Sequence, residues 1–268
     1  MRRRWPLCLA SAALFCLCSL PNHTLIERTA SLITGTSRPP YDAWPAYKVQ
    51  LNSSTAAATA QTICQDRNPP RDGLWLPPDG KKDLTVFILP YRARRGHLEL
   101  SRLGIHALMR SQRRAHWLFE GRGPFNRGKL MNAGFDLASS RVAGQGFGEA
   151  CYVFHDVDLL PASGNVSYEC LSGTARHVSA AIEKFKWRLP YSSNFGGIVA
   201  MSGSAYKQMN GHSNAYWGWG GEDDDAWLRA HFSGLCVHRL PTDASAFYSP
   251  RHARDRGNVP SKVNQNFA

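Results

Sequence analysis

The sequence lacks any apolar run that would clearly span a bilayer. Among its 268 residues, no uninterrupted hydrophobic stretch reaches the roughly 18 residues that mark a spanning helix. A multi-span channel or transporter is therefore excluded. The 7 cysteines show no C-x-x-C spacing, so a cysteine-based zinc site is not expected. Acidic residues are also scarce, because 20 Asp and Glu stand against 32 Lys and Arg and leave a formal charge of +12.

The excess positive charge is unevenly distributed. Basic residues gather at Arg2–Arg4, between Tyr91 and Leu130, and in the tail that contains Arg251 and Lys262, whereas Glu222–Asp225 form an acidic block. A basic chain suggests a nucleic-acid partner at first. Charge that is clustered in this way also suits a small polyphosphate or another polyanion. The choice between these partners depends on the compartment.

The N-terminus indicates entry into the secretory pathway. Arg2–Arg4 precede an apolar stretch from Trp5 to Leu20, which is either a cleaved signal peptide or a short membrane anchor. No small-x-small cleavage site stands out near Leu20, which favours the anchor. We therefore expect a cytosolic tail over residues 1–4, an anchor over 5–20 and a lumenal remainder. Sequons begin at Asn22, Asn52 and Asn165 and agree with this topology, which makes nucleic acid an unexpected partner.

The part of the chain after the anchor divides into a tether and a globular region. Residues 21–80 are rich in Ser, Thr, Ala and Pro and predict a lumenal stem. Residues 84–89 (LTVFIL) and 151–154 predict buried strands, and residues 116–119 a further strand. Helices are predicted after the first strand and over 129–138. The apolar faces expected for them are Leu100, Leu103, Ala107 and Leu108 in the first helix, and Leu130, Ala133 and Leu137 in the second.

This alternation predicts a layered α/β domain with a mostly parallel central sheet. Ligands of such sheets bind beyond the carboxyl ends of the strands. Asp156-Val157-Asp158 follows directly after a predicted strand. Two carboxylates in that position suit a divalent ion that bridges the protein to phosphate oxygens. A solvated turn explains an isolated D-x-D equally well, so this motif alone does not decide the function.

A second motif has a rarer composition. In Tyr216–Asp225 (YWGWGGEDDD), two tryptophans and three glycines precede four acidic residues. Glycines let the backbone approach a ligand closely, indole faces can stack on sugar rings, and one of the clustered carboxylates can act as a base. Acidic residues also favour a helix N-terminus, and a helix is predicted to continue through Ala226–Arg229. The structural and the chemical interpretations are compatible.

The chain resembles the β-1,4-galactosyltransferase family, which includes an N-acetylgalactosaminyltransferase branch. The motifs that carry the resemblance occur in family order across roughly residues 84–268: Leu89–Arg94, Phe125–Leu130, Asp156–Pro161, Phe195–Gly197, Trp217–Asp225 and Arg251–Asp255. The resemblance implies a catalytic domain over 81–268 with a Rossmann-like nucleotide-sugar-binding fold of the GT-A type. It also implies a single-pass type II Golgi membrane protein with its catalytic domain in the lumen.

By resemblance, the enzyme would transfer galactose or N-acetylgalactosamine from a UDP-sugar, with inversion and with Mn²⁺ as cofactor, to a terminal sugar acceptor in β-1,4 linkage. N-acetylglucosamine or glucose on a glycoprotein or glycolipid is the expected acceptor. Asp223 would be the catalytic base, Glu222 would orient hydroxyl groups beside it, and Asp158 and His252 would bind the metal. The residues implied for the acceptor site are Tyr191, Gly197, Asp224 and Phe267. Those implied for the donor site are Pro90, Tyr91, Arg92, Arg94, Phe125, Arg127, Asp156, Val157, Lys184, Asn194 and Trp219.

The resemblance also implies a disulfide between Cys151 and Cys170, while Cys64 and Cys236 are left either to pair or to stay free. Asn194 precedes Phe195-Gly196-Gly197 where galactose-transferring members usually carry tyrosine. The smaller side chain leaves room for an N-acetyl group and favours use of UDP-N-acetylgalactosamine.

Two further departures bear on activity. Ser249 and Arg254 occupy the positions of a third metal ligand, and neither is a strong ligand. Family members usually continue beyond the position of Phe267-Ala268, so the catalytic domain is expected to be short at its C-terminus. These departures keep an inactive or lectin-like paralogue, which binds UDP or a glycan without turnover, as the alternative to an enzyme. A secreted polyanion binder that uses the Arg-rich segment is a third alternative.

Overall fold

The computed structural model describes residues 74–77, 79, 83–92, 94–112, 114–121, 125–143 and 145–250. The expected cytosolic tail, the anchor and most of the stem lie outside the described residues, as do His252 and Phe267. Within the described ranges, no helix combines the length and the apolar character needed to cross a membrane.

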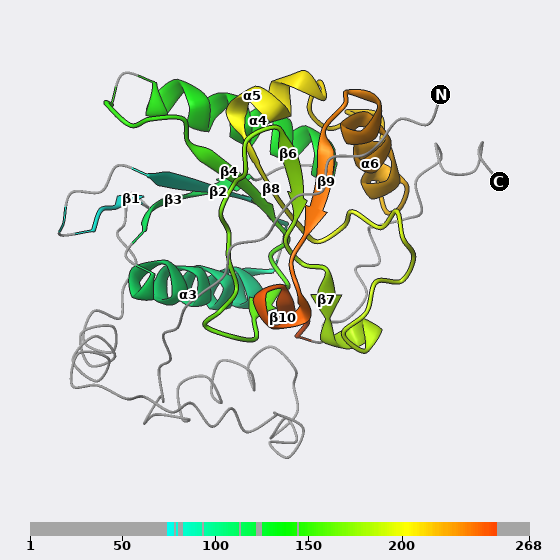
Figure 1. Ribbon diagram of the computed structural model, residues 1–268, viewed down its shortest axis with the longest axis horizontal. Helices are drawn as coiled ribbons and strands as arrows, with labels where there is room; N and C mark the ends of the chain where they lie inside the picture. Colours follow the sequence, from blue (N-terminus) through cyan, green and yellow to red (C-terminus); the bar gives the residue numbers. More distant parts are fainter. Residues whose placement is uncertain are drawn as a thin grey trace, which may run out of the picture.

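The main sheet has seven strands in the order β1-β3-β2-β4-β8-β6-β9 (Figure 1). These strands are β1 Leu74–Trp75, β2 Leu84–Pro90, β3 Ala115–Gly121, β4 Cys151–His155, β6 Thr174–His177, β8 Ile198–Ser202 and β9 Cys236–Arg239. A second sheet, ordered β5-β10-β7, consists of β5 Leu160–Pro161, β7 Ala181–Ile182 and β10 Ala246–Tyr248. Strand β1 lies in the range predicted as stem and pairs with β3, so the folded domain includes residues before 81.

The predicted α/β fold is confirmed, but the sheet is mixed instead of mostly parallel. The pairs β3–β2, β2–β4 and β6–β9 are parallel, whereas β1–β3, β4–β8 and β8–β6 are antiparallel. Parallel neighbours need a crossover, usually a helix. Helices α3 (Arg95–Ser111) and α4 (Arg127–Val142) supply crossovers between β2, β3 and β4, whereas the connections from β4 to β6 and from β6 to β8 contain no α-helix.

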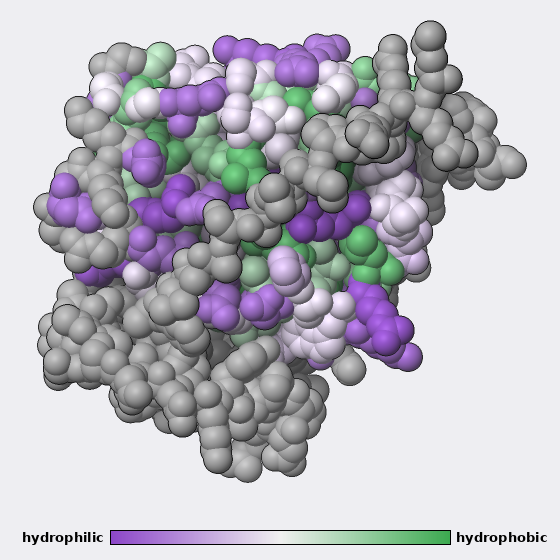
Figure 2. Space-filling view, viewed as in Figure 1, coloured by the Kyte–Doolittle hydropathy of each residue, from purple (hydrophilic) through white to green (hydrophobic). Residues whose placement is uncertain are grey.

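Strand β2 builds the core on both faces of the sheet because its successive side chains point to opposite sides. Val86 and Ile88 belong to one buried cluster, together with side chains of α4, α5 (Gly203–Gln208) and α6 (Glu222–Phe232). Phe87 and Leu89 belong to the other cluster, with side chains of α3. Figure 1 shows α4 and α5 on one side of the sheet and α3 on the other. On the coloured part of the face in Figure 2, hydrophilic and hydrophobic residues form small interleaved patches.

Helix α4 buries a different face from the one predicted. Leu137 is 49% exposed and Ala133 is also exposed, whereas Met131 and Phe135 are buried. The buried stripe continues through Ala138 and Val142, spaced as one helix face requires. The helix also approaches β2 closely at Gly134, where a Cβ would lie 2.5 Å from Ile88 Cγ2. Apolar spacing alone could not separate the two faces, because both carry apolar residues.

Helix α3 shows the same kind of shift. Leu100 and Leu108 are buried as predicted, but Ala107 is exposed and Leu103 is only partly buried. Ser101 lies on the buried face instead, where its hydroxyl donates to the Val157 carbonyl oxygen at 2.7 Å. A polar residue that is buried through a hydrogen bond is invisible to a count of apolar positions.

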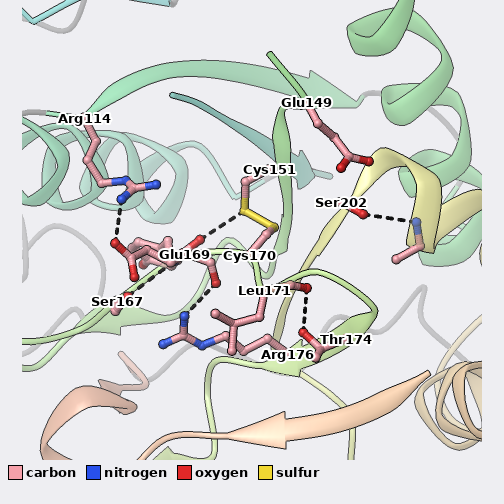
Figure 3. The surroundings of a disulfide bond; sticks show 12 residues. Arg114, Glu149, Cys151, Ser167, Glu169, Cys170, Leu171, Thr174, Arg176 and Ser202 are labelled. Atoms are coloured by element: carbon pink, nitrogen blue, oxygen red, sulfur yellow. Dashed lines mark hydrogen bonds and ion pairs between the residues drawn. A yellow bond between two sulfur atoms is a disulfide. The ribbon is translucent and has the colours of Figure 1, made fainter. Parts of the chain in front are cut away.

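The predicted disulfide between Cys151 and Cys170 is present, with a Cα–Cα distance of 5.4 Å. It joins β4 to the loop that follows β5. Figure 3 shows Arg114 and Arg176 beside this loop, where the Arg114 guanidinium pairs with the Glu169 carboxylate at 2.7 Å and Arg176 donates to the Glu169 carbonyl oxygen at 2.6 Å. Cys236 is exposed on β9, and Cys64 lies outside the described residues.

The two faces of α4 provide a matched test of the core. Phe135→Ala should lower the free energy of unfolding by about 3–5 kcal/mol, because it leaves a cavity against β2 and β4. Leu137→Ala, two residues away, should change it by no more than about 0.5 kcal/mol. Urea unfolding followed by tryptophan fluorescence measures both values. Equal losses in the two variants would contradict the observed orientation of the helix.

Candidate functional site

Arg127 is the centre of the candidate site, and local sequence places it there. Asn126 caps α4, with its side-chain oxygen accepting from the Lys129 backbone N–H at 2.8 Å, so Arg127 is the first helical residue. Gly128 packs against the backbone, since a Cβ there would lie 2.4 Å from the Ser213 carbonyl oxygen. These two constraints direct the long Arg127 side chain into the protein, where only 8% of it remains exposed.

The Arg127 guanidinium joins two carboxylates from distant parts of the chain. Its Nε donates to Asp156 Oδ1 at 2.7 Å, and its Nη1 donates to Asp223 Oδ1 at 2.6 Å. Nη2 also donates to the Gly197 carbonyl oxygen at 3.4 Å. Asp156 follows β4, and Asp223 is in the first turn of α6. The D-x-D motif and the acidic motif of the sequence therefore meet at one arginine.

The charges in this cluster are strongly coupled. Burial opposes the charge on Arg127, but Asp156 and Asp223 more than offset it and raise the pKa of the guanidinium above its ordinary value. Burial raises the pKa of Asp156 to about 6, although Arg127 acts in the opposite direction. Burial and then the Asp223 carboxylate raise the pKa of Glu222 to about 7. Carboxyl groups shifted this far towards neutral pH are typical of functional sites.

Two glycines let the cluster close. An ideal Cβ on Gly196 would lie 2.4 Å from Asp223 Oδ2, so a side chain at this position would displace the carboxylate. Gly197 has a φ of +86°, and a Cβ there would meet Ser179 Oγ at 2.5 Å. Its carbonyl oxygen accepts from the Asp156 backbone N–H at 3.1 Å. The Phe195-Gly196-Gly197 motif therefore brings the backbone close to the Asp223 carboxylate and to the backbone of Asp156.

The acidic motif forms the N-terminus of α6, as predicted. Glu222, Asp223, Asp224 and Asp225 occupy its first turn, where the helix dipole favours negative charge. The preceding glycines all have positive φ angles: 95° at Gly218, 105° at Gly220 and 88° at Gly221. This backbone leaves Trp219 63% exposed and Trp217 50% exposed beside the carboxylates. Exposed aromatic rings next to hydrogen-bond acceptors are suited to bind a sugar.

The predicted donor-binding segment after β2 also reaches the D-x-D loop. Pro90 ends β2 and Tyr91 follows it. Arg92 lies with its Cζ 5.2 Å from the centroid of the Phe125 ring. Arg94 Nη1 donates to Asp158 Oδ2 at 2.9 Å. The structure thus brings Arg94 and Arg127 to the loop that contains Asp156 and Asp158, while the predicted donor residues Arg92 and Phe125 contact each other.

The D-x-D loop is anchored from beneath by a buried histidine. His155 Nδ1 donates to the Asp156 carbonyl oxygen at 2.8 Å, so Nε2 accepts from the Tyr168 hydroxyl at 3.0 Å. Burial lowers the pKa of His155 to about 4 and keeps the ring neutral. Tyr168 belongs to the loop closed by the disulfide, so that loop supports the D-x-D motif. Val157 is itself buried.

The side chains near the D-x-D loop suit a hard or borderline divalent ion, but few potential metal ligands are among the described residues. No group of three His, Cys, Asp or Glu side chains with metal-binding geometry occurs among the residues that the structure describes. Asp158 supplies one carboxylate, and His252, which would add an imidazole, lies outside them. One carboxylate, one imidazole and the oxygens of a bound diphosphate form a chemically reasonable set for Mn²⁺.

The remaining predicted residues divide into two groups. Tyr191 joins the site, since its hydroxyl donates to Asp224 Oδ1 at 2.8 Å, and Asn194 lies three residues later in the same loop. Lys184 is exposed in the short helix η2 (Glu183–Phe185), and no described contact links it to Arg127 or Asp158. Phe267, like His252, falls outside the described residues. His177 and Arg239 support the site through hydrogen bonds to the carbonyl oxygens of Gly196 and Asn194. No motif in the sequence points to either residue.

Removing the central guanidinium should be costly. Arg127→Ala leaves two carboxylates without their buried partner and should lower the free energy of unfolding by about 3–5 kcal/mol. Arg229→Ala is the matched control. It breaks a partly exposed pair with Asp225 within α6 and a hydrogen bond to the Asn210 carbonyl oxygen, and should cost about 1 kcal/mol or less. Urea titration compares the two, and equal stabilities would refute the central role of Arg127.

Two family models match the chain between residues 40 and 253. The family model described as the N-terminal region of glycosyl transferase group 7 matches residues 40–171, and that described as the N-terminal domain of galactosyltransferase matches residues 176–253. Human β-1,4-galactosyltransferase 3 is 39% identical over 178 residues, which are 65% of this chain and 44% of the human protein. Mouse β-1,4-galactosyltransferase 2 is 37% identical over 194 residues, 70% of this chain and 51% of the mouse protein.

The chain therefore spans about half the length of the curated relatives that it matches. Among solved structures, the catalytic domain of Drosophila β-1,4-galactosyltransferase 7 in complex with xylobiose superposes with a TM-score of 0.57 at 31% identity, covering 69% of this chain and 78% of that one. A mutant of the Drosophila enzyme, in complex with manganese, UDP-Gal and xylobiose, gives 0.56 at 30% identity with the same coverage. The chain belongs to the β-1,4-galactosyltransferase family.

Proposed function

We propose that this protein is an inverting glycosyltransferase that moves galactose or N-acetylgalactosamine from a UDP-sugar to a terminal sugar acceptor in β-1,4 linkage. The observation that carries the proposal is the Arg127 cluster. In it, a single guanidinium binds both the D-x-D loop and the acidic turn of α6. The loop suits a diphosphate and its metal, and the turn suits an acceptor hydroxyl. The relatives that match this chain are named as β-1,4-galactosyltransferases, and a mutant of the Drosophila enzyme was solved with manganese, UDP-Gal and xylobiose.

In this proposal the donor lies along the segment after β2 and the D-x-D loop. Arg92 and Phe125 would contact the uridine side, and Arg94, now paired with Asp158, would turn towards the diphosphate when a cation takes its place. Asp158 and His252 would hold Mn²⁺, which would stabilise negative charge on the departing diphosphate. Lys184 would add positive charge near the phosphates.

The acceptor would lie over the first turn of α6. Trp219 and Tyr191 would flank the sugar ring, and Glu222 and Asp224 would accept hydrogen bonds from its hydroxyls. Asp223 would be the base, with Oδ1 fixed by Arg127 and Oδ2 beside Gly196. The acceptor oxygen attacks the anomeric carbon as its proton passes to Asp223, and the bond from that carbon to the diphosphate oxygen breaks with its electron pair leaving on UDP.

The proposed setting follows from the N-terminal pattern. Arg2–Arg4 and the apolar stretch up to Leu20 would anchor the protein in the Golgi membrane as a single-pass type II protein with a lumenal catalytic domain. A lumenal setting would supply UDP-sugars and the terminal sugars of glycoproteins and glycolipids. It also suits the Cys151–Cys170 disulfide, since disulfides persist in oxidising compartments.

Replacing the proposed base tests the reaction. Asp223→Asn keeps the shape of the side chain but cannot take the proton, so kcat/KM for sugar transfer should fall by about 10²–10⁴. UDP release is measured with Mn²⁺, each UDP-sugar, and N-acetylglucosamine or glucose. Asp225→Asn in the same helical turn is the control and should stay near wild type, since Asp225 is occupied by Arg229. Wild-type activity in Asp223→Asn refutes the base, and UDP binding without any transfer by the wild type indicates a lectin-like paralogue.

The donor sugar is tested at Asn194. Asn194→Tyr fills the space proposed for the N-acetyl group, so the ratio of kcat/KM for UDP-N-acetylgalactosamine to that for UDP-galactose should fall by about tenfold or more. Asn194→Ser, which keeps a small polar side chain, should leave the ratio near that of the wild type. A ratio that does not move towards galactose in the tyrosine variant removes Asn194 as the determinant.

A further inference from the structure

Arg239 is the last residue of β9 and lies directly opposite His177 in the parallel pair with β6. From this position its guanidinium donates in two directions. Nε donates to His177 Nδ1 at 3.2 Å, and Nη2 donates to the carbonyl oxygens of Ser192 at 3.0 Å and Asn194 at 2.9 Å. Arg239 has no described contact with Asp223, Asp158 or Arg127.

The first direction determines the state of a fully buried histidine. A guanidinium has donors and no acceptor, so His177 Nδ1 must accept and the proton of the neutral ring must sit on Nε2. Burial lowers the pKa of His177 to about 4, which keeps the ring neutral. Nε2 then donates to the Gly196 carbonyl oxygen at 2.8 Å, where the Ser179 hydroxyl also donates at 3.1 Å. Arg239 therefore selects the tautomer that holds Gly196, the residue against Asp223 Oδ2.

The second direction holds the loop that contains Tyr191 and Asn194. This loop is a turn closed by the Asn194 backbone N–H donating to the Tyr191 carbonyl oxygen at 3.1 Å. The Arg239 Nη2 group holds the carbonyls of two of its residues, Ser192 and Asn194. The Tyr191 hydroxyl in turn donates to Asp224 Oδ1 at 2.8 Å. One guanidinium on β9 thus fixes both the turn and the glycine that follows it.

We propose that Arg239 is the positioning residue for the segment Tyr191–Gly196, and through it for sugar selection. It holds Tyr191 and Asn194 at set positions relative to the acidic turn of α6 without touching a substrate. The effect on sugar selection rests on the proposed function, whereas the ordering of the segment does not. A lysine could not replace Arg239, because three acceptors lie around a planar fork that a single ammonium group does not reproduce.

Hydrogen exchange of the full chain without substrate tests the ordering. In Arg239→Ala, and in Arg239→Lys as the variant that retains the charge, exchange in a peptide spanning residues 189–197 should accelerate by about tenfold or more. Exchange in a peptide from β2, residues 84–90, should stay at its wild-type rate, which shows that the fold is intact. Arg229→Ala, which removes a guanidinium bonded to the Asn210 carbonyl oxygen, is the control and should leave both peptides unchanged. Wild-type protection of 189–197 in Arg239→Lys overturns the proposal.

Steady-state kinetics on the same preparations tests selection. Arg239→Lys should raise the KM for the acceptor by about tenfold and lower the discrimination between the two UDP-sugars, while the affinity for UDP stays within about twofold of wild type. A uniform loss of kcat with unchanged KM values indicates a merely structural role and overturns the proposal. A wild-type chain that transfers no sugar refutes the proposed function, and the exchange result then decides the positioning role on its own.

Discussion

The candidate site depends on one buried guanidinium that must be shared between two carboxylates. Arg127 cannot lose its proton, and its side chain is almost withdrawn from water, so it requires negative partners within hydrogen-bonding distance. Asp156 and Asp223 meet that requirement from separate parts of the chain. Either carboxylate alone would leave the charge of Arg127 poorly compensated. The folded structure therefore holds the end of β4 and the start of α6 together around this side chain. This electrostatic constraint assembles the two chemical motifs into one site.

The surrounding structure serves to hold that meeting point. A side chain at Gly196 would collide with Asp223, and one at Gly197 would collide with Ser179 and Leu159, so both glycines are needed for this close packing. His155 holds the D-x-D loop through a hydrogen bond to the Asp156 carbonyl oxygen, and His177 holds Gly196 through a hydrogen bond to its carbonyl oxygen. Both histidines are buried and neutral, each with a tautomer determined by its partners. Hydrogen-bonded support of this kind holds the functional side chains of a site in alignment, although the supporting residues take no part in the chemistry.

The family of this protein is established, whereas its activity is a proposal. The motifs, the fold and the likeness to the Drosophila enzyme establish the family. In the proposed function, Asn194 would bear on the choice of donor sugar and Ser249 on metal coordination, so the substrate of this member would depend on its own residues. The hydrogen bond from Arg239 to the Asn194 carbonyl oxygen links that position to strand β9.

The sequence by itself determined the strands at 84–89 and 151–154, the acidic start of α6 and the Cys151–Cys170 pair, because each has a strong local pattern or a motif shared with the family. It did not determine the buried faces of α3 and α4, since apolar residues occur on both sides of each helix and a hydrogen-bonded Ser101 can be buried. Nor did it indicate the mixed sheet or the contacts of Arg239. Only the tertiary structure decided these, because burial and the pairing of residues 62 apart, such as His177 and Arg239, arise from packing and not from neighbouring sequence.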